Sequence, residues 1–136
     1  MSFPYMNPLV VSGAQELVAS GLASQEVVVF RTAAKGSLQA AWACADATAA
    51  ATSNLTTVFY NRGTAGAGTT ILGTAGGSGS VWGATTPKTV TLANNTDIDA
   101  DSYITALTTR IAASTASAWS LRFGFEFLAG SPATAN

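Results

Sequence analysis

The sequence contains no histidine, a single cysteine, and only six basic and seven acidic residues among 136. Without histidine, the chain cannot use Ser–His or Cys–His nucleophile activation, and it has no imidazole ligand for a metal. Cys44 has no partner for an internal disulfide, and Trp42 and alanines surround it. We therefore expect Cys44 to be a small buried residue and not a reactive thiol. No catalytic constellation is visible, and we expect no enzyme and no cofactor.

Charge is scarce as well as balanced. Charged residues make up 10% of the chain, against about 25% in an ordinary soluble domain, and the formal net charge is −1. This balance predicts neither nucleic acid nor an anionic membrane as a partner. Disorder is not expected, because 48% of the residues are hydrophobic. A surface so poor in charge is weakly protected against association, which predicts a chain that packs against copies of itself or other subunits.

Long apolar runs are also missing. No stretch of about twenty apolar residues is present, so no membrane span is expected. The first eight residues lack the basic start and the apolar core of a signal peptide. Both features predict a protein made in a cytoplasm.

The clearest positive signal is the alternation between Trp119 and Phe127. A strand places successive side chains on opposite faces. The residues at odd positions are large and apolar and would form one buried wall: Trp119, Leu121, Phe123, Phe125 and Phe127. Ser120, Arg122 and Glu126 would face the other way. This pattern predicts a β-strand with one buried face.

Six further strands are predicted, at Glu26–Thr32, Ser37–Ala45, Leu55–Asn61, Thr69–Leu72, Lys88–Leu92 and Tyr103–Ile111. The segment Ser37–Ala45 is rich in alanine, which also favours helix. We choose strand because Leu38, Ala40, Trp42 and Cys44 alternate, and this alternation places Trp42 in the core. Gly73–Ser80 is expected to be a flexible loop.

Short alternating strands joined by Gly, Ser, Thr and Asn turns predict two packed sheets. The expected fold is all-β: an antiparallel β-sandwich, jelly-roll-like, with an extended N-terminal arm. A small closed β-barrel is the alternative. The expected division is residues 1–25 as arm and first short strand, residues 26–128 as the sandwich, and residues 129–136 as a tail.

The N-terminal segment combines apolar residues with two prolines. Pro4 and Pro8 hold the backbone extended and prevent an early helix. We expect an arm before Pro8, a short strand at Leu9–Ser12, and at most one helical turn within residues 14–22. The apolar residues are predicted to contact a capsid or another subunit: Phe3, Tyr5, Met6, Leu9, Val10 and Val11.

Three aspartates, Asp97, Asp99 and Asp101, alternate in the way that begins a calcium loop. The sixth and twelfth positions of that pattern require Gly and Glu, but Ser102 and Thr108 stand there. We favour aspartates that cap a turn, with a looser oxygen-ligand cation site as the alternative. No metal site is assigned.

Two other features receive structural interpretations. Glu126 and Arg122 fit a charged sheet surface or a subunit contact better than a paired-carboxylate site. Trp82, beside Gly83 and a glycine-rich loop, is the tryptophan expected to be exposed at an interface or a ligand site.

The order of these segments resembles that of small β-sandwich decoration (cement) and head-fibre proteins of tailed bacteriophage virions. The resemblance is carried by Leu38–Ala45, Leu55–Thr64 with Thr70–Leu72, Thr89–Asn95 with Ile98–Ile104, and Trp119–Phe127. It implies a virion protein on the capsid surface, a homotrimer whose partner is the major capsid protein, with no catalytic residues. A tail-fibre or baseplate module that binds a receptor or carbohydrate is the alternative, with Trp82 at its site.

Overall fold

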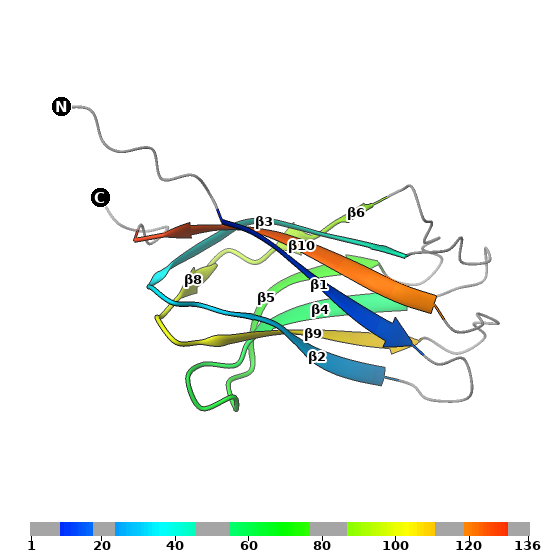
Figure 1. The fold of residues 1–136 in the computed structure, drawn as a ribbon, viewed down its shortest axis with the longest axis horizontal. Coiled ribbons are helices and arrows are strands. Elements are labelled where there is room, and N and C mark those ends of the chain that lie inside the picture. Colours follow the sequence, from blue (N-terminus) through cyan, green and yellow to red (C-terminus); the bar gives the residue numbers. More distant parts are fainter. Residues whose placement is uncertain (1–8, 18–23, 46–54, 77–86, 111–118, 131–136) are drawn as a thin grey trace.

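The computed structural model describes residues 9–17, 24–45, 55–76, 87–110 and 119–130 (Figure 1). All regular elements in these ranges are strands. They are β1 (Leu9–Leu17), β2 (Ser24–Arg31), β3 (Gly36–Ala45), β4 (Leu55–Asn61), β5 (Thr70–Gly76), β6 (Lys88–Thr89), β7 (Thr91–Leu92), β8 (Asp97–Ile98), β9 (Tyr103–Arg110) and β10 (Trp119–Ala129).

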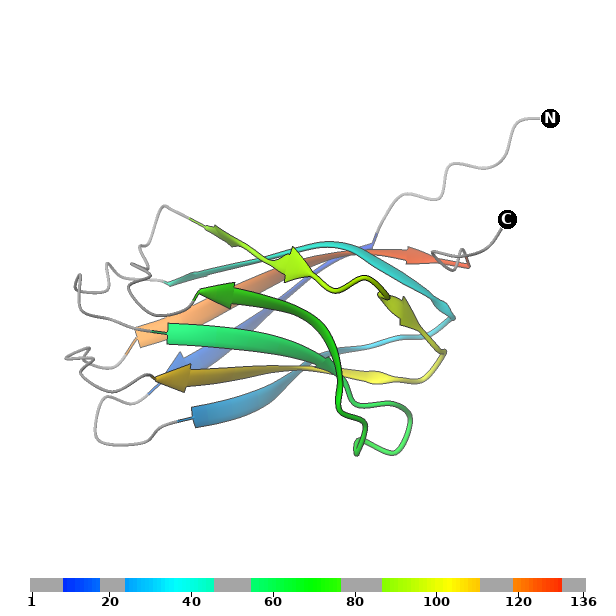
Figure 2. The same cartoon turned by 180° about the vertical axis from the view of Figure 1, so that it is seen from behind.

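The strands form two antiparallel sheets that face one another (Figures 1 and 2). Sheet A has the order β1-β10-β3-β6, with β8 also paired to β3, and sheet B has the order β2-β9-β4-β5-β7. The pairs are nested along the chain: β1 with β10, β2 with β9, β3 with β6 and β8, and β4 with β5. Such nesting is one long hairpin rolled into two sheets, which is a jelly roll. The expected sandwich is confirmed, and among the strands named above the hydrogen-bonded ladders do not close into a barrel.

The wall predicted on the last strand lies in the core. Leu121, Phe123, Phe125 and Phe127 are between 0% and 3% exposed, whereas Arg122 and Glu126 are exposed. The side chain of Trp119 lies outside the described residues. The alternation therefore predicted both the strand and its buried face, and β10 continues to Ala129.

Phenylalanine rings from the two sheets interleave at the centre of the sandwich. Phe59 of β4 packs edge-to-face between Phe123 and Phe125, with ring centroids 5.5 and 5.0 Å away. Phe30 of β2 packs between Phe125 and Phe127 at 5.3 and 6.0 Å. Contacts of this geometry add about 0.5–1.5 kcal/mol each to the burial of the rings. The series, here called the ring series, holds sheet A against sheet B.

Trp42 is the main correction to the expected core. On β10, Glu126 pairs with Ala40 and Phe127 pairs with Leu38, so Gln39 of β3 is an extra residue. A bulge of one residue exchanges the two faces of a strand. After it, Ala41 and Ala43 are buried and Trp42 is 36% exposed, so its predicted inward position was wrong. The indole lies over Gly124, its cross-strand partner, where any Cβ would overlap it.

Two segment boundaries also differ from expectation. β1 extends to Leu17, so residues 14–17 form strand and not a helical turn; residues 18–22 lie outside the described ranges. β5 extends to Gly76, so the predicted loop at Gly73–Ser80 begins as strand, and residues 77–80 are not described. Gly73 is needed there because a Cβ would meet the side chain of Val90 and the backbone of Thr91.

The single strand predicted at Lys88–Leu92 is divided between the two sheets. β6 pairs with β3 in sheet A, and β7 pairs with β5 in sheet B. Val90 lies between them with its side chain buried, and its backbone N–H donates to the carbonyl of Ala41 at 3.0 Å. The segment therefore crosses from one sheet to the other along one side of the sandwich.

Candidate functional site

The contact residues predicted at the N-terminus are only partly described. Leu9, Val10 and Val11 lie in β1, where they pair with Phe127, Glu126 and Phe125 of β10. They therefore belong to an edge strand of sheet A, although their side-chain contacts are not described. Phe3, Tyr5 and Met6 of the arm lie outside the described residues, as does Trp82.

The predicted aspartate cluster lies at a corner of the fold. Asp97 begins β8, while Asp99 and Asp101 are exposed and form ion pairs with different residues. Asp99 lies 3.7 Å from Lys35, and Asp101 lies 3.0 Å from Arg31. Within the described ranges no group of three or more metal-ligating side chains occurs. The two salt bridges connect the corner before β9 to the end of β2 and to the turn between β2 and β3.

The largest exposed apolar side chains of sheet B lie on its outer face, away from the ring series. Val28 is 56% exposed and Ile71 is 46% exposed. In the ladder, Val28 is opposite Thr105, Thr105 is opposite Tyr60, and Tyr60 is opposite Ile71. These four residues form one row across β2, β9, β4 and β5.

A second row lies beside the first. Glu26 is opposite Leu107, Leu107 is opposite Val58, and Val58 is opposite Thr74. Leu107, Val58 and Thr74 are half-buried, and Glu26 is exposed. The two rows together are called the sheet B face below. Val28 and Ile71 are exposed at the two ends of the first row, while Tyr60 is half-buried and Thr105 is buried between them. One carboxylate, that of Glu26, lies at the β2 edge of the face.

Arg62 lies across this face and neutralises that carboxylate. Its Nε and Nη2 atoms donate to Oε1 of Glu26 at 2.8 and 2.6 Å, and Nη1 donates to the carbonyl of Gly68 at 2.9 Å. The guanidinium also stacks over Tyr60, 4.3 Å from the ring centroid. Only 17% of the Arg62 side chain is exposed. Charge, stacking and hydrogen bonds therefore hold this arginine in one place.

The local sequence after β4 explains how Arg62 is placed. Gly63 has φ 68°, a conformation that glycine adopts without strain, and its N–H donates to Oδ1 of Asn61 at 2.9 Å. Gly68 donates its N–H to the carbonyl of Arg62 at 2.7 Å and closes the loop. Asn61, Arg62 and Gly63 therefore form a turn that directs Arg62 back over the sheet.

Glu26 stays ionised in this setting. Burial disfavours the charged carboxylate, but hydrogen bonds from Thr105 and Arg62, together with the charge of Arg62, outweigh burial and lower the pKa of Glu26 below its usual value of 4.5. The pair therefore carries no net charge at neutral pH. A partner that covers the face need not supply a counter-charge.

Sequence reasoning missed this face for a physical reason. Val29 on β2 and Leu72 on β5 are extra residues at bulges, and each changes which side chains point outward. The run Val27–Phe30 is apolar throughout, so no alternation marks its outer side. The one feature of the sequence that could have indicated this face is a pair of opposite charges, Glu26 and Arg62, at the ends of two apolar strands.

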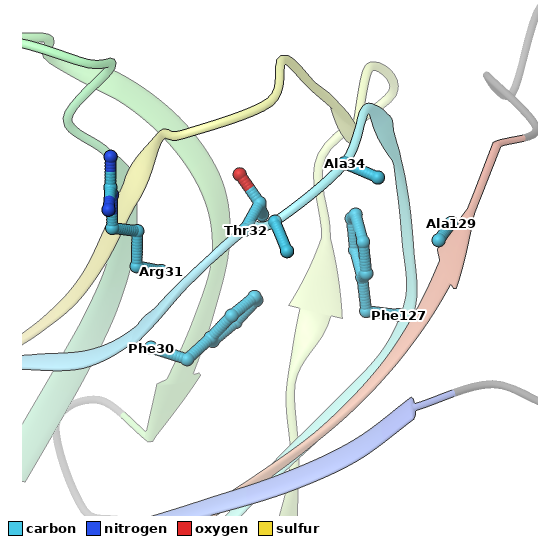
Figure 3. A pocket seen from close by; sticks show the side chains of 7 residues that line it. Phe30, Arg31, Thr32, Ala34, Phe127 and Ala129 are labelled. Atoms are coloured by element: carbon cyan, nitrogen blue, oxygen red, sulfur yellow. The ribbon is translucent and has the colours of Figure 1, made fainter.

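A pocket opens at one end of the sandwich, where the ring series stops (Figure 3). Its volume is about 130 Å³. It is lined by Phe30, Arg31, Thr32, Ala33, Ala34, Phe127 and Ala129. The pocket lies between the end of β2 in sheet B and the end of β10 in sheet A.

In the described part of the chain, no helix is long and apolar enough to cross a membrane. Neither protein-family models, nor curated proteins, nor solved structures gave a match to this chain. The functional conclusion therefore depends on the geometry of the surfaces described above.

Proposed function

We propose that this chain is a structural protein of a tailed-phage virion, a decoration protein that binds the outer surface of the head and stabilises capsomer contacts. It would act as a homotrimer with the major capsid protein as its partner. The observation that supports this role is the sheet B face, where Val28 and Ile71 are about half exposed at opposite ends of a row across four strands. Such a surface favours a protein partner.

The size of the face suggests how it would be used. Adjacent strands are about 4.8 Å apart, so the four strands of each row span roughly 15 Å. A stable interface usually covers about 800 Å² on each partner, which is more than two rows of this width provide. One face alone would bind weakly. Three subunits that engage the shell together would gain affinity through effective concentration.

The electrostatics of the face support the same use. Glu26 and Arg62 already pair with one another, so a covering surface does not have to desolvate an isolated charge. The scarcity of charge in the whole chain favours burial against other subunits as well. Jelly rolls occur in viral capsids and in lectin domains, so the fold is compatible with this role but does not select it.

The proposal is tested by adding the purified chain to phage heads that were assembled without it, followed by co-sedimentation. The wild type should saturate the heads, while Val28→Asp and Ile71→Asp should bind at least tenfold more weakly, because each buries an unpaired charge. Asn94→Asp adds a carboxylate at an exposed position between β7 and β8 and is the matched control. Unchanged binding by both face variants would contradict the proposed role of the face.

A tail-fibre or baseplate module that binds carbohydrate is the second candidate. It is favoured by Trp42, which is exposed on the outer face of sheet A beside exposed Arg122 and Glu126. Aromatic rings next to polar groups suit sugar binding. Saturable quenching of tryptophan fluorescence by host surface glycans, abolished in Trp42→Ala, would support this candidate. Immunogold labelling separates the two, since label on the tail favours the fibre and label on the head favours decoration.

A further inference from the structure

The pocket at the end of the sandwich is an unfilled place in the ring series. From Phe123 to Phe127, the rings of β10 alternate with Phe59 and Phe30 of sheet B. The next inward position on β10 after Phe127 is Ala129, and Ala34 lies across from it (Figure 3). Ala33 also lines the pocket. Three small side chains stand where one more ring would continue the series.

The volume of the pocket matches one ring. It is about 130 Å³, and an apolar cavity of about 150 Å³ is large enough to bind benzene in another protein. A ring placed in the pocket would contact Phe30 and Phe127, two aromatic neighbours that already pack against one another at 6.0 Å. The pocket therefore suits one phenyl group or one branched aliphatic side chain.

The polar side chains of the lining are engaged elsewhere. Thr32 donates its hydroxyl to the carbonyl of Asp99 at 2.7 Å and accepts from the N–H of Ser102 at 3.0 Å. Arg31 pairs with Asp101. A polar ligand would lose its hydration without gaining a partner. The pocket lining therefore favours an apolar ring, such as that of phenylalanine, over a ring that carries a hydroxyl, such as that of tyrosine.

Both ends of the described chain lie beside this pocket. Leu9 pairs with Phe127, and the N–H of Gly130 donates to the carbonyl of Lys35 at 2.6 Å. The six residues after Gly130, Ser-Pro-Ala-Thr-Ala-Asn, contain no large apolar side chain. The eight residues before Leu9 contain Phe3, Tyr5 and Met6. The N-terminal segment therefore supplies the suitable side chains.

We propose that the pocket receives Phe3 from a second copy of this chain. Pro8 lacks an N–H for the ladder with β10, and both prolines favour extended backbone at the residues before them. A segment that the prolines keep extended would have to reverse direction to enter the pocket of its own chain, so a second copy is the better acceptor. Phe3 precedes Leu9 by six positions, which can span about 20 Å when extended, enough to enter a neighbouring subunit.

This inference rests on the proposed self-association and names the contact that makes it. When each subunit gives its segment to the next, three copies close a ring and fill every pocket. The arrangement uses a different surface from the sheet B face, which stays available for the shell. Shell binding and ring formation can therefore be tested separately.

Disulfide trapping tests which copy supplies the segment. Phe3→Cys and Ala34→Cys are placed on separate full-length chains, both with Cys44→Ser, and the two chains are co-expressed and oxidised. We expect disulfide-linked pairs of chains, and none when Ala67→Cys in the exposed loop after β4 replaces Ala34→Cys. A chain that carries both cysteines and closes only within itself would overturn the proposal, as would the absence of any cross-link.

A second test compares a substitution that fills the pocket with substitutions that shorten side chains of the arm. Ala129→Leu should occupy the pocket, leave the thermal midpoint unchanged or higher, and weaken trimer association at least tenfold by sedimentation. Phe3→Ala should weaken association by as much, Tyr5→Ala by less, and the matched control Ala67→Leu should have no effect. Trimers that survive both Ala129→Leu and Phe3→Ala would contradict the proposal.

The outcomes separate this inference from the function on which it rests. Cross-linked trimers that fail to bind heads would support the arm contact and refute the decoration role. Chains that bind heads but show no cross-link would support the decoration role and refute the arm contact.

Discussion

The two faces of sheet B differ although neighbouring residues of the same strands form them. On β4, Phe59 is fully buried between Phe123 and Phe125, while the next residue, Tyr60, lies on the outer face under Arg62. The inner face stabilises the sandwich through aromatic packing. The outer face leaves Val28 and Ile71 about half exposed, which adds little to folding. Apolar side chains that the fold does not use remain available to a partner.

Polar groups are also used differently on the two faces. Inside, the hydroxyls of Thr57 and Thr108 lie 2.8 Å apart and are both buried. Outside, Glu26 and Arg62 form an ion pair that keeps part of its contact with water. A buried hydroxyl without a partner is costly, whereas a surface pair contributes modestly. The difference predicts large effects of substitutions inside and small effects outside.

The comparison is tested most strongly at Phe59. Phe59→Ala removes the ring between Phe123 and Phe125 and leaves a cavity, so we expect a loss of about 3–5 kcal/mol in the free energy of unfolding. Urea unfolding followed by tryptophan fluorescence measures this loss. A change below about 1 kcal/mol would mean that the ring series does not hold the sheets together.

A smaller effect is expected at Glu26. Glu26→Gln removes the charge that Arg62 pairs with, and the partly exposed pair predicts a loss of about 1 kcal/mol at pH 7. Because the pKa of Glu26 is lowered in the folded chain, its contribution is present above the usual pKa of 4.5 and is lost as the pH falls through the lower folded value.

Unfolding of wild type and Glu26→Gln should therefore be compared from pH 7 to pH 3. The gap in stability between them should narrow as the pH approaches 3. The substitution Glu126→Gln, at an exposed position on the outer face of sheet A, serves as the matched control. A gap that is constant with pH would show that the charge of Glu26 does not stabilise the fold.

The smallest effect on folding is expected at Ile71. Ile71→Ser changes an exposed side chain on the outer face, so the free energy of unfolding should stay within about 0.5 kcal/mol of the wild type. Binding to heads should nevertheless fall, because the substitution removes apolar area from the sheet B face. Thr70→Ser, at the adjacent exposed position, is the control. A large loss of stability would assign Ile71 to the fold and not to a partner.

Alternation predicted the fold where it was uninterrupted. The run from Leu121 to Phe127 revealed a strand, its buried face and hence a two-layer sandwich, and β-branched residues marked β4 with its observed bounds. The pattern failed where a bulge inserted one residue. Gln39 reversed the faces of β3 and exposed Trp42, a change that depends on pairing with β10 and is invisible in the local sequence.

The candidate sites depend on contacts between distant segments. The first row of the sheet B face joins residues 28, 105, 60 and 71, which come together only when four strands take their register. The pocket likewise needs the end of β2 beside the end of β10. The sequence shows that Glu26 and Arg62 carry opposite charges beside two apolar strands, but not that they meet across β9.

The central claim is that another protein covers the sheet B face in the assembled virion. A density map of the phage head, detailed enough to orient a jelly roll, tests it most directly. We predict copies of this chain at regular lattice positions outside the shell, with Val28 and Ile71 against a neighbouring protein. A head that lacks the chain, or copies whose sheet B face is turned to solvent, would contradict the account.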